Sequence, residues 1–429
     1  MTDASAVPGA PAVPGAPAVT GASAVTGASA VTGASAVTGA SAISAALTEG
    51  NASHQAFQVK EGRSRGRASG LRVGLICPYS LSRPGGVQGQ VLGIARTMRA
   101  MGVEARVLAP CDGPPPYPWV SPLGASVPAA ANGSVAPIAP DPAAALRTIR
   151  VLRDERFDIV HLHEPLVPGP TLTALLFSDG PLVATFHRSG DISWYRAIKG
   201  PSRWALKRLA LRCAVSALAR ETAQQVLGGE YELVWNGIDV GVVDAASPWP
   251  KPGPTILFVG RHEPRKGLAV LVEAVVRYGV EAKVWVAGEG PQTAELREAT
   301  LGDQRFEWLG MVPEAEKLRR MRGADVLAAP SIGAESFGVV LLEGMAARAA
   351  IVASDIPGYA NVARRCRDAI LVPPGNAGAL ASALREALAG GPDIKAMRES
   401  AYERAAEHSL DALAHRYLEL YDRVLRASR

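Results

Sequence analysis

Apolar segments of strand length alternate with segments of helix length along most of this chain. The pattern runs through residues 70–245 and resumes over residues 255–408. Strand–helix alternation of this kind is typical of parallel sheets that are covered by helices on both faces. The sequence therefore predicts an α/β protein with two Rossmann-like domains. The expected strands span residues 71–76, 103–109, 158–162, 182–186, 231–234, 255–260, 282–287, 305–308, 325–328 and 350–353.

Three segments lie outside the alternating regions. The Pro-rich stretch 246–254 is expected to link the two domains, and residues 409–429 are expected to form a final helix. Residues 1–69 contain repeated six-residue units of small residues. Because small residues bury too little apolar area to offset chain entropy, we expect this tail to be disordered. A six-residue β-helix is the alternative, but these repeats lack its bulky inward-facing position.

Composition limits the class of protein. The chain has 429 residues, 48% hydrophobic and 20% charged, which suits a globular protein with two cores. Its 4 cysteines form no Cys-x-x-Cys pair, which favours reduced thiols in a cytosol over zinc or disulfides. No apolar run reaches the roughly 20 residues that a membrane-spanning helix needs. Asp3 near the start is not typical of a signal peptide.

Two glutamates separated by seven residues form the most informative local motif. Glu335 is expected in the loop that follows the predicted strand 325–328. The next helix is expected to begin at Ser336 or Phe337 and to carry Glu343. Because a helix N-terminus attracts phosphate, the motif suits a ligand with a diphosphate and hydroxyls, such as a nucleotide sugar. An amphipathic helix with two solvated glutamates is the alternative.

A basic loop follows the predicted strand 255–260. It contains Arg261, Arg265 and Lys266 at the end of a strand, where open α/β sheets bind ligands. Arg and Lys donors can stabilise the charge of a departing nucleoside diphosphate, and each charge-assisted hydrogen bond contributes about 1.5–3 kcal/mol. The loop therefore predicts leaving-group stabilisation without a metal, and a solvated basic loop is the alternative.

Seven short motifs follow one another along the chain. They are Pro78-Tyr79-Ser80, Pro84-Gly85-Gly86-Val87-Gln88, His163-Glu164-Pro165, Ala184-Thr185-Phe186-His187, Asn236-Gly237-Ile238-Asp239, Glu263-Pro264-Arg265-Lys266-Gly267 and Glu335-Ser336-Phe337-Gly338. In this order they resemble the retaining GT-B glycosyltransferases of family 4, and most of all the actinobacterial phosphatidylinositol α-mannosyltransferases. The likeness begins near residue 71 and implies an active site in a cleft between the domains, with the final helix crossing back to the first domain.

The resemblance also implies how a nucleotide sugar would bind. Arg261 and Lys266 would contact the diphosphate, Glu335 the sugar hydroxyls and Glu343 the ribose, while His187 would lie near the transferred sugar. The catalytic residues would then be Glu335, His187, Arg261 and Lys266. The implied donor-binding set is Gly85, Gly86, Gly260, Arg261, Lys266, Gly288, Lys317, Glu335, Ser336, Phe337, Gly338, Val339 and Glu343. The family retains the anomeric configuration, which favours same-face attack with the leaving phosphate as base.

The acceptor side departs from the family pattern. The resemblance assigns the acceptor to Tyr79, Gln88, Gln90, Glu164 and Arg188. However, Gln90 stands where the family has histidine, Leu166 where it has asparagine and Pro137 where it has arginine. Leucine and proline side chains cannot bond an inositol hydroxyl or phosphate. We therefore expect a lipid or small polyol acceptor of phosphatidylinositol type or a relative of it, and the departures favour a relative.

Residues 188–212 carry seven basic residues against one acid. Lys199, Arg203 and Lys207 recur every four positions and would form one helical stripe, which is typical of a surface anchor for anionic lipid. An ordinary helix that buries Trp204 and its apolar neighbours is the alternative. No nucleic-acid recognition motif accompanies the basic residues, so we expect no nucleic-acid partner.

Together with this resemblance, the sequence predicts a monomeric, cytoplasmic, metal-independent hexosyltransferase that uses a nucleotide sugar, and the resemblance implies GDP-mannose as the donor. Attachment to the inner face of the plasma membrane is a further hypothesis that depends on residues 188–212. A UDP-sugar-dependent enzyme of the same family is one alternative. A non-catalytic homologue that binds nucleotide sugar as a regulator is the other.

Overall fold

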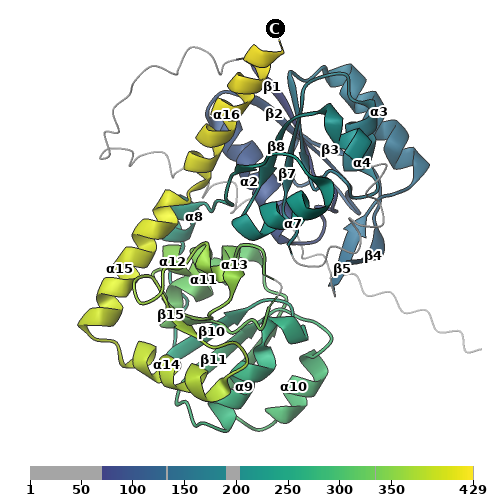
Figure 1. Cartoon of the computed structure of the whole chain (residues 1–429). Helices are drawn as coiled ribbons and strands as arrows, with labels where there is room; N and C mark the ends of the chain where they lie inside the picture. Colours follow the sequence, from purple (N-terminus) through teal and green to yellow (C-terminus); the bar gives the residue numbers. More distant parts are fainter. Residues whose placement is uncertain (1–69, 132–133, 190–202, 334, 429) are drawn as a thin grey trace, which may run out of the picture. The chain divides into compact units, whose positions relative to one another are not determined.

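The computed structural model describes residues 70–131, 134–189, 203–333 and 335–428, which belong to one compact unit. The tail predicted to be disordered, residues 1–69, lies outside these described residues. The described part contains two parallel sheets, one in each half of the chain, and a short hairpin (Figure 1). The predicted α/β fold with two parallel-sheet domains is therefore confirmed.

The first sheet has seven parallel strands in the order β3-β2-β1-β6-β7-β8-β9. Successive side chains of β1 alternate between two cores, with Val73 and Leu75 on one face and Ile76 on the other, as expected for a sheet covered on both faces. The strands are β1 (Arg72–Ile76), β2 (Glu104–Ala109), β3 (Val120–Pro122), β6 (Ile159–His163), β7 (Leu182–Phe186), β8 (Leu209–Ala214) and β9 (Glu232–Leu233). The helices are α2 (Gly86–Ala100), α3 (Pro142–Glu155), α4 (Pro170–Phe177), η1 (Leu206–Arg208) and α7 (Ala217–Leu227), and the hairpin is β4 (Val127–Ala131) and β5 (Ser134–Ile138).

The second sheet has six parallel strands in the order β12-β11-β10-β13-β14-β15. Leu257 and Leu327 face one core, while Ile256 and Val326 face the other. The strands are β10 (Thr255–Val259), β11 (Lys283–Ala287), β12 (Phe306–Gly310), β13 (Val326–Ala329), β14 (Ala350–Ser354) and β15 (Ile370–Val372). The helices are α8 (Val240–Ala245), η2 (Pro264–Lys266), α9 (Leu268–Val276), α10 (Thr293–Ala299), α11 (Glu314–Gly323), α12 (Val339–Ala346), α13 (Pro357–Ala360), α14 (Ala377–Ala389) and α15 (Pro392–Glu407).

Each sheet has one position where the strand order reverses direction along the sheet. In the first sheet it lies between β1 and β6, and in the second between β10 and β13. The loops that leave neighbouring strands there go to opposite faces, which opens a crevice at the C-terminal ends of the strands. The topology therefore brings the loops after β1 and β6, and those after β10 and β13, to the places where α/β sheets bind ligands.

The chain passes between the two halves earlier than the sequence predicted. Residues 246–254 were expected to be the linker, but Ile238 and Val243 already pack in the core of the second half. Asn236 and Gly237 lie in a segment without a helix or a regular strand. Ile238 in that segment forms a parallel bridge to Ser409. Ile238 also exchanges backbone hydrogen bonds with His408 and Leu410, so two passages of the chain run side by side here.

The final helix, α16 (Leu410–Ala427), packs against α2 of the first half, and α15 packs in the core of the second (Figure 1). Ser409 caps α16 by accepting a hydrogen bond from the Ala412 N–H. One face of α16 is buried in the first core through Leu413, Tyr417 and Tyr421. The helix thus completes a core that the residues before it leave open.

The side chain of Gln90 on α2 forms hydrogen bonds to the backbone of Gly237, which precedes the bridge at Ile238. Its side-chain amide donates to the Gly237 carbonyl at 2.7 Å, and its carbonyl accepts from the Gly237 N–H at 2.9 Å, with only 5% of Gln90 exposed. Both groups of Gly237 are buried, so removing their partner leaves two unsatisfied polar groups. The structure thus gives Gln90 a different role from the acceptor contact that the sequence predicted.

Replacing Gln90 with leucine should lower the free energy of unfolding by about 2–4 kcal/mol, because two buried backbone groups lose their partners. Urea unfolding followed by circular dichroism would measure this change. Gln224→Leu is the matched control, since Gln224 makes one exposed hydrogen bond to Gly229. Equal stability of Gln90→Leu and the wild type would contradict a structural role for the Gln90 amide.

The basic segment 188–212 is only partly described. Lys199 lies outside the described residues, Lys207 lies in η1, and the strand β8 begins at Leu209, so the predicted helix does not continue through this region. Trp204 is 65% exposed, which contradicts the alternative in which it is buried. In the described part of the chain, no helix is long and apolar enough to span a membrane.

Candidate active site

The loops after β10 and β13 bring the predicted donor residues of the second half together. Lys266 lies at the end of η2, and its Nζ is 2.5 Å from a carboxylate oxygen of Glu335 in the loop after β13. Arg265 contacts the same oxygen at 3.2 Å. Arg261 has its Nε 2.8 Å from one carboxylate oxygen of Glu263, and Arg265 Nε lies 2.9 Å from the other. The structure therefore joins the two loops by ion pairs at the reversal point of the sheet.

The second glutamate of the motif has a lysine of its own. Glu343 on α12 accepts from Lys317 Nζ on α11 at 3.0 Å, and Lys317 also contacts Glu314 at 2.8 Å. Burial raises the pKa of Glu343, against the opposing effect of Lys317. Burial acts to lower the pKa of Lys317, but the two carboxylates outweigh it and raise the pKa overall. Each glutamate of the pair is thus held by a cation, Glu335 by Lys266 and Glu343 by Lys317.

The helix between the two glutamates begins later than predicted. Ser336 and Phe337 lie in the loop, Gly338 is the N-cap with φ +90°, and α12 starts at Val339. Only glycine adopts this left-handed backbone without strain, and a Cβ at Gly338 would lie 2.7 Å from the Tyr359 ring. Phe337, which directly precedes Gly338, is 3% exposed and packs in the core of the second half. The structure thus corrects the predicted start at Ser336 or Phe337.

Two glycines of the predicted donor set allow a close backbone approach. Gly260 follows β10 and Gly288 follows β11, and a Cβ at Gly288 would lie 2.0 Å from the Gly260 carbonyl oxygen. Gly288 also has φ +120°, where side chains are disfavoured. The basic loop after β10 can therefore lie directly against the loop after β11.

In the first half, Glu164 orders the backbone that carries the predicted catalytic histidine. The carboxylate of Glu164 accepts hydrogen bonds from the backbone N–H of His187 at 2.5 Å and of Arg188 at 2.6 Å. Glu164 itself has φ +53°, an uncommon conformation for a residue with a side chain that is often found at functional sites. Glu164, predicted to contact the acceptor, therefore has a positioning contact in this structure.

The remaining predicted residues of the first half surround the start of α2. Gly85 is the N-cap of α2 and Gly86 its first residue. Gln88 is 7% exposed and donates to the Ser80 carbonyl at 3.4 Å, within the loop after β1. Tyr79 in the same loop is partly buried, and burial raises the pKa of its hydroxyl. The acceptor roles of Tyr79, Gln88 and Arg188 stay predictions.

A hydrogen bond joins the loops of the two halves. Ser189 donates to the hydroxyl of Ser336 at 2.9 Å. Ser336 follows Glu335, and Ser189 lies two residues after His187, so this contact links the loop of the predicted histidine with that of the predicted glutamate. The resemblance implied a site shared by both halves, and these two loops meet in the structure.

Sequence reasoning missed a buried polar network beneath His187. His163 Nδ1 lies 2.9 Å from His187 Nε2, and the His163 ring stacks on His161 with centroids 4.4 Å apart. His161 Nδ1 lies 2.6 Å from the Tyr421 hydroxyl, and its Nε2 lies 2.8 Å from the Thr185 hydroxyl. The alternation of His161 and His163 on β6 is visible in the sequence, but Tyr421 comes from a helix 260 positions further on.

These histidines predict acid sensitivity of the fold. Burial lowers the pKa of His161 and of His187 from 6.5 to about 3, and that of His163 well below 6.5. In the unfolded chain these histidines bind protons as the pH falls below about 6.5, whereas in the folded chain they stay neutral down to about pH 3. Their contribution to the free energy of unfolding is therefore fully present above about pH 6.5 and is lost as the pH drops toward 3. Between about pH 7 and about pH 5, His161 and His187 should each lower the free energy of unfolding by about 2 kcal/mol, and His163 should lower it further.

Urea unfolding at these two pH values would measure the effect. The exposed His415 supplies a control, since His415→Asn should leave the pH dependence unchanged. An unfolding free energy that stays constant between about pH 7 and about pH 5 would show that the three rings are not neutral in the folded protein.

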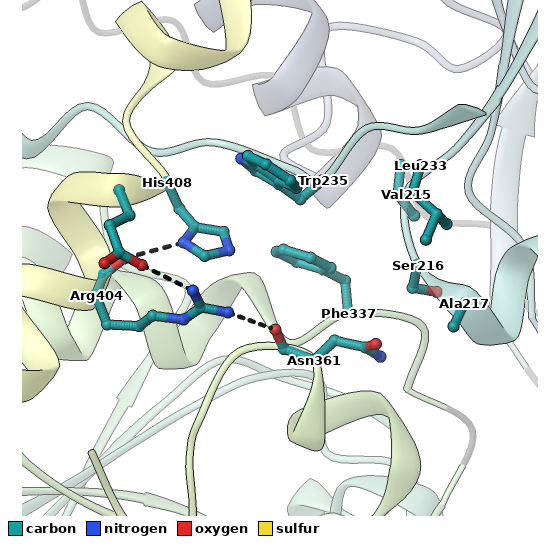
Figure 2. A pocket seen from close by; sticks show the side chains of 10 residues that line it. Val215, Ser216, Ala217, Leu233, Trp235, Phe337, Asn361, Arg404 and His408 are labelled. Atoms are coloured by element: carbon teal, nitrogen blue, oxygen red, sulfur yellow. Dashed lines mark hydrogen bonds and ion pairs between the residues drawn. The ribbon is translucent and has the colours of Figure 1, made fainter. Parts of the chain in front are cut away.

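A pocket of 390 Å³ lies beside Phe337 (Figure 2). His408 lies close to two other aromatic rings in it, with centroids 5.4 Å from Trp235 and 6.0 Å from Phe337. The Arg404 guanidinium at its edge donates to the Asn361 carbonyl. Of the described residues that line the pocket, Phe337 belongs to the predicted donor set, so the pocket adjoins the donor loop. In the described part of the chain, no cluster of three or more His, Cys, Asp or Glu residues could hold a metal ion.

Comparison with known proteins identifies the family. Residues 84–242 match the family described as Glycosyltransferase Family 4, and residues 253–390 match Glycosyl transferases group 1. A phosphatidyl-myo-inositol mannosyltransferase of Mycobacterium leprae is 41% identical over 323 residues, covering 73% of this chain and 86% of that protein. The chain belongs to glycosyltransferase family 4. The phosphatidyl-myo-inositol mannosyltransferase of Mycolicibacterium smegmatis is 40% identical over 327 residues, covering 73% of this chain and 84% of that protein.

Solved structures have the same fold as this family 4 chain. A sucrose-phosphate synthase from Thermosynechococcus elongatus superimposes with a TM-score of 0.66 at 19% identity, covering 83% of this chain and 100% of that one. Anabaena HepE in complex with UDP and glucose gives a TM-score of 0.64 at 17% identity, with coverages of 82% and 99%. The family, the GT-B fold and the glycosyltransferase activity predicted from the sequence are confirmed.

Proposed function

We propose that this family 4 glycosyltransferase transfers mannose from GDP-mannose to a phosphatidylinositol-type lipid, with retention and without a metal. The observation that carries the proposal is the cluster of Lys266, Arg265 and Glu335 at the reversal point of the second sheet. Its mannose and inositol specificity is supported by relatives about 40% identical that are named phosphatidyl-myo-inositol mannosyltransferases.

The donor would bind by exchanging partners with the ion pairs of the second half. A diphosphate brings its own negative charge to Lys266 and Arg261, which releases Glu335 to accept hydrogen bonds from sugar hydroxyls. The first N–H groups of α12, at Val339 and its neighbour, add donors for the phosphate. Glu343, held by Lys317, would accept from the ribose hydroxyls. These residues stabilise the charge that develops on the leaving nucleoside diphosphate.

His187 would face the transferred sugar as a neutral ring. Burial lowers its pKa to about 3, so near pH 7 it can donate or accept a hydrogen bond but carries no charge to share. Retention then requires the acceptor hydroxyl to attack from the face that the diphosphate leaves. The departing phosphate oxygen would take the proton of that hydroxyl, and no nucleophilic side chain is required.

A different acceptor is the second candidate, because three departures from the family pattern are used inside the protein. Gln90 bonds to Gly237, Leu166 is 3% exposed in a core of the first half, and Pro137 is buried with its carbonyl accepting from the Ser80 N–H. None of these side chains presents a polar group to an inositol. A relative of phosphatidylinositol with fewer hydroxyl contacts would suit such a site.

The test uses the purified full chain, vesicles containing phosphatidylinositol and a panel of GDP-mannose, UDP-glucose and UDP-N-acetylglucosamine, without added metal. We expect lipid-linked mannose from GDP-mannose alone, with the α-anomer seen by NMR. Donor hydrolysis with GDP-mannose and no lipid product would favour the second candidate. Turnover of a UDP-sugar instead would reject mannose as the donor sugar. A selective thermal shift without any hydrolysis or transfer would favour the non-catalytic alternative.

A further inference from the structure

The bond between His163 and His187 constrains both rings at once. It joins Nδ1 of His163 to Nε2 of His187 at 2.9 Å. Burial lowers the pKa of both rings, so both are neutral near pH 7 and each carries one ring proton. If the shared proton belongs to His163, the proton of His187 must be on Nδ1. If it belongs to His187, the proton of His163 must be on Nε2. The two rings therefore always have the same tautomer.

The surroundings of His163 favour one of the two states. His163 is fully buried, and its Nε2 has no hydrogen-bond partner among the described residues. Buried N–H groups without a partner are rarer than buried acceptors without one. The state with an unprotonated Nε2 is therefore preferred, and in that state the Nδ1–H of His163 donates to His187.

His187 then has its remaining ring proton on Nδ1. This atom has no hydrogen-bond partner in the described part of the chain, and His187 is only partly buried. The Glu164 carboxylate holds the backbone N–H of His187 at 2.5 Å, so the ring and the backbone are fixed independently. An N–H held in this way can meet a ligand oxygen without first reorienting.

We propose that His163 is a positioning residue that holds His187 with its Nδ1–H directed at a hydroxyl oxygen of the transferred sugar. This inference rests on the proposed function, which supplies the sugar. His161 supports His163 from behind by stacking, and Tyr421 fixes His161. The Tyr421 hydroxyl lies 2.6 Å from His161 Nδ1, and this hydrogen bond holds that ring in place.

The decisive measurement is the tautomer of His187 in the full-length protein labelled with ¹⁵N-histidine. The nitrogen–proton correlation patterns of the two tautomers differ, and His187→Gln identifies the signal. We expect the Nδ1–H pattern in the wild type near pH 7. An Nε2–H pattern would overturn the proposal. The result needs no substrate, so it stands apart from any failure of GDP-mannose or of the lipid as substrates.

Kinetics of two variants complete the test. His163→Leu removes the donor and should lower kcat by about tenfold, the effect of one lost hydrogen bond, with the donor KM changed by less than about twofold. His163→Asn keeps an N–H near the Nδ1 position and should recover most of that loss. His415→Asn, on the exposed face of α16, is the matched control. Unchanged kcat in folded His163→Leu would also overturn the proposal.

Discussion

Replacing Glu335 with glutamine should lower kcat/KM for sugar transfer by about 10²–10³-fold. The carboxylate is the only change, but two functions depend on its charge. It would accept charge-assisted hydrogen bonds from the sugar hydroxyls, each worth about 1.5–3 kcal/mol. Before the donor binds, it also pairs with Lys266, whose Nζ lies 2.5 Å away, and so keeps that cation in the site. The bonds to the sugar strengthen as charge separates in the transition state, so kcat should fall with kcat/KM.

Initial rates with GDP-mannose, both for hydrolysis and for transfer, would measure this loss. Glu273→Gln is the matched control, because Glu273 lies on α9 in the same half and pairs only with Arg277 among the described residues. The thermal midpoint should stay close to that of the wild type, which separates a chemical effect from unfolding. Retention of more than about a tenth of the wild-type rate would exclude Glu335 from the catalytic role.

Replacing Lys266 with methionine should lower kcat by about 10²–10³-fold, because the leaving diphosphate loses a fixed cation. The Lys266 side chain is 21% exposed, so its charge is screened less than that of a surface lysine. Methionine keeps most of the aliphatic volume and removes the charge. Arg265 remains 3.2 Å from Glu335, so that carboxylate keeps a cationic partner.

The kinetic constant that changes in Lys266→Met shows whether Lys266 acts in donor binding or in the chemical step. If Lys266 acts on the leaving group, kcat and kcat/KM fall together, whereas a loss confined to KM would mean that it only binds the ground state. Lys266→Arg should recover part of the rate, since it restores charge with a different geometry. Lys395→Met, an exposed lysine on α15, is the control and should behave like the wild type.

Most of the fold could be predicted from the sequence because its signals are local. Apolar strands such as residues 182–186 are found where expected, and the ends of the others differ by only a few residues. The start of α12 was predicted too early because the left-handed backbone of Gly338 prevents the helix from including the residues before it. The interdomain passage was misplaced because Ile238 and Val243 pack in the second core, a preference that their apolar character alone does not reveal.

The candidate site likewise has features that the sequence predicted and contacts that only the structure shows. Motif spacing predicted Glu335, Lys266 and His187, which follow recognisable strands, and Glu343 on the helix after Glu335. It did not reveal the pairing of the glutamates, one with Lys266 and the other with Lys317. The resemblance placed Gln90 among the acceptor contacts, although its amide is bonded to a backbone 147 positions away.

By itself, the sequence determined the family, the two parallel sheets and the residue types that a nucleotide sugar needs. These signals are local, because periodicity and short motifs involve residues within a few tens of positions of each other. Only the tertiary structure decided which side chains face each other. His163 meets His187 because β6 and β7 are neighbours in register, and Tyr421 reaches His161 because α16 returns to the first core. Hydrogen-bond partners such as these depend on distances between segments that are far apart in the chain. A local sequence pattern does not predict those distances.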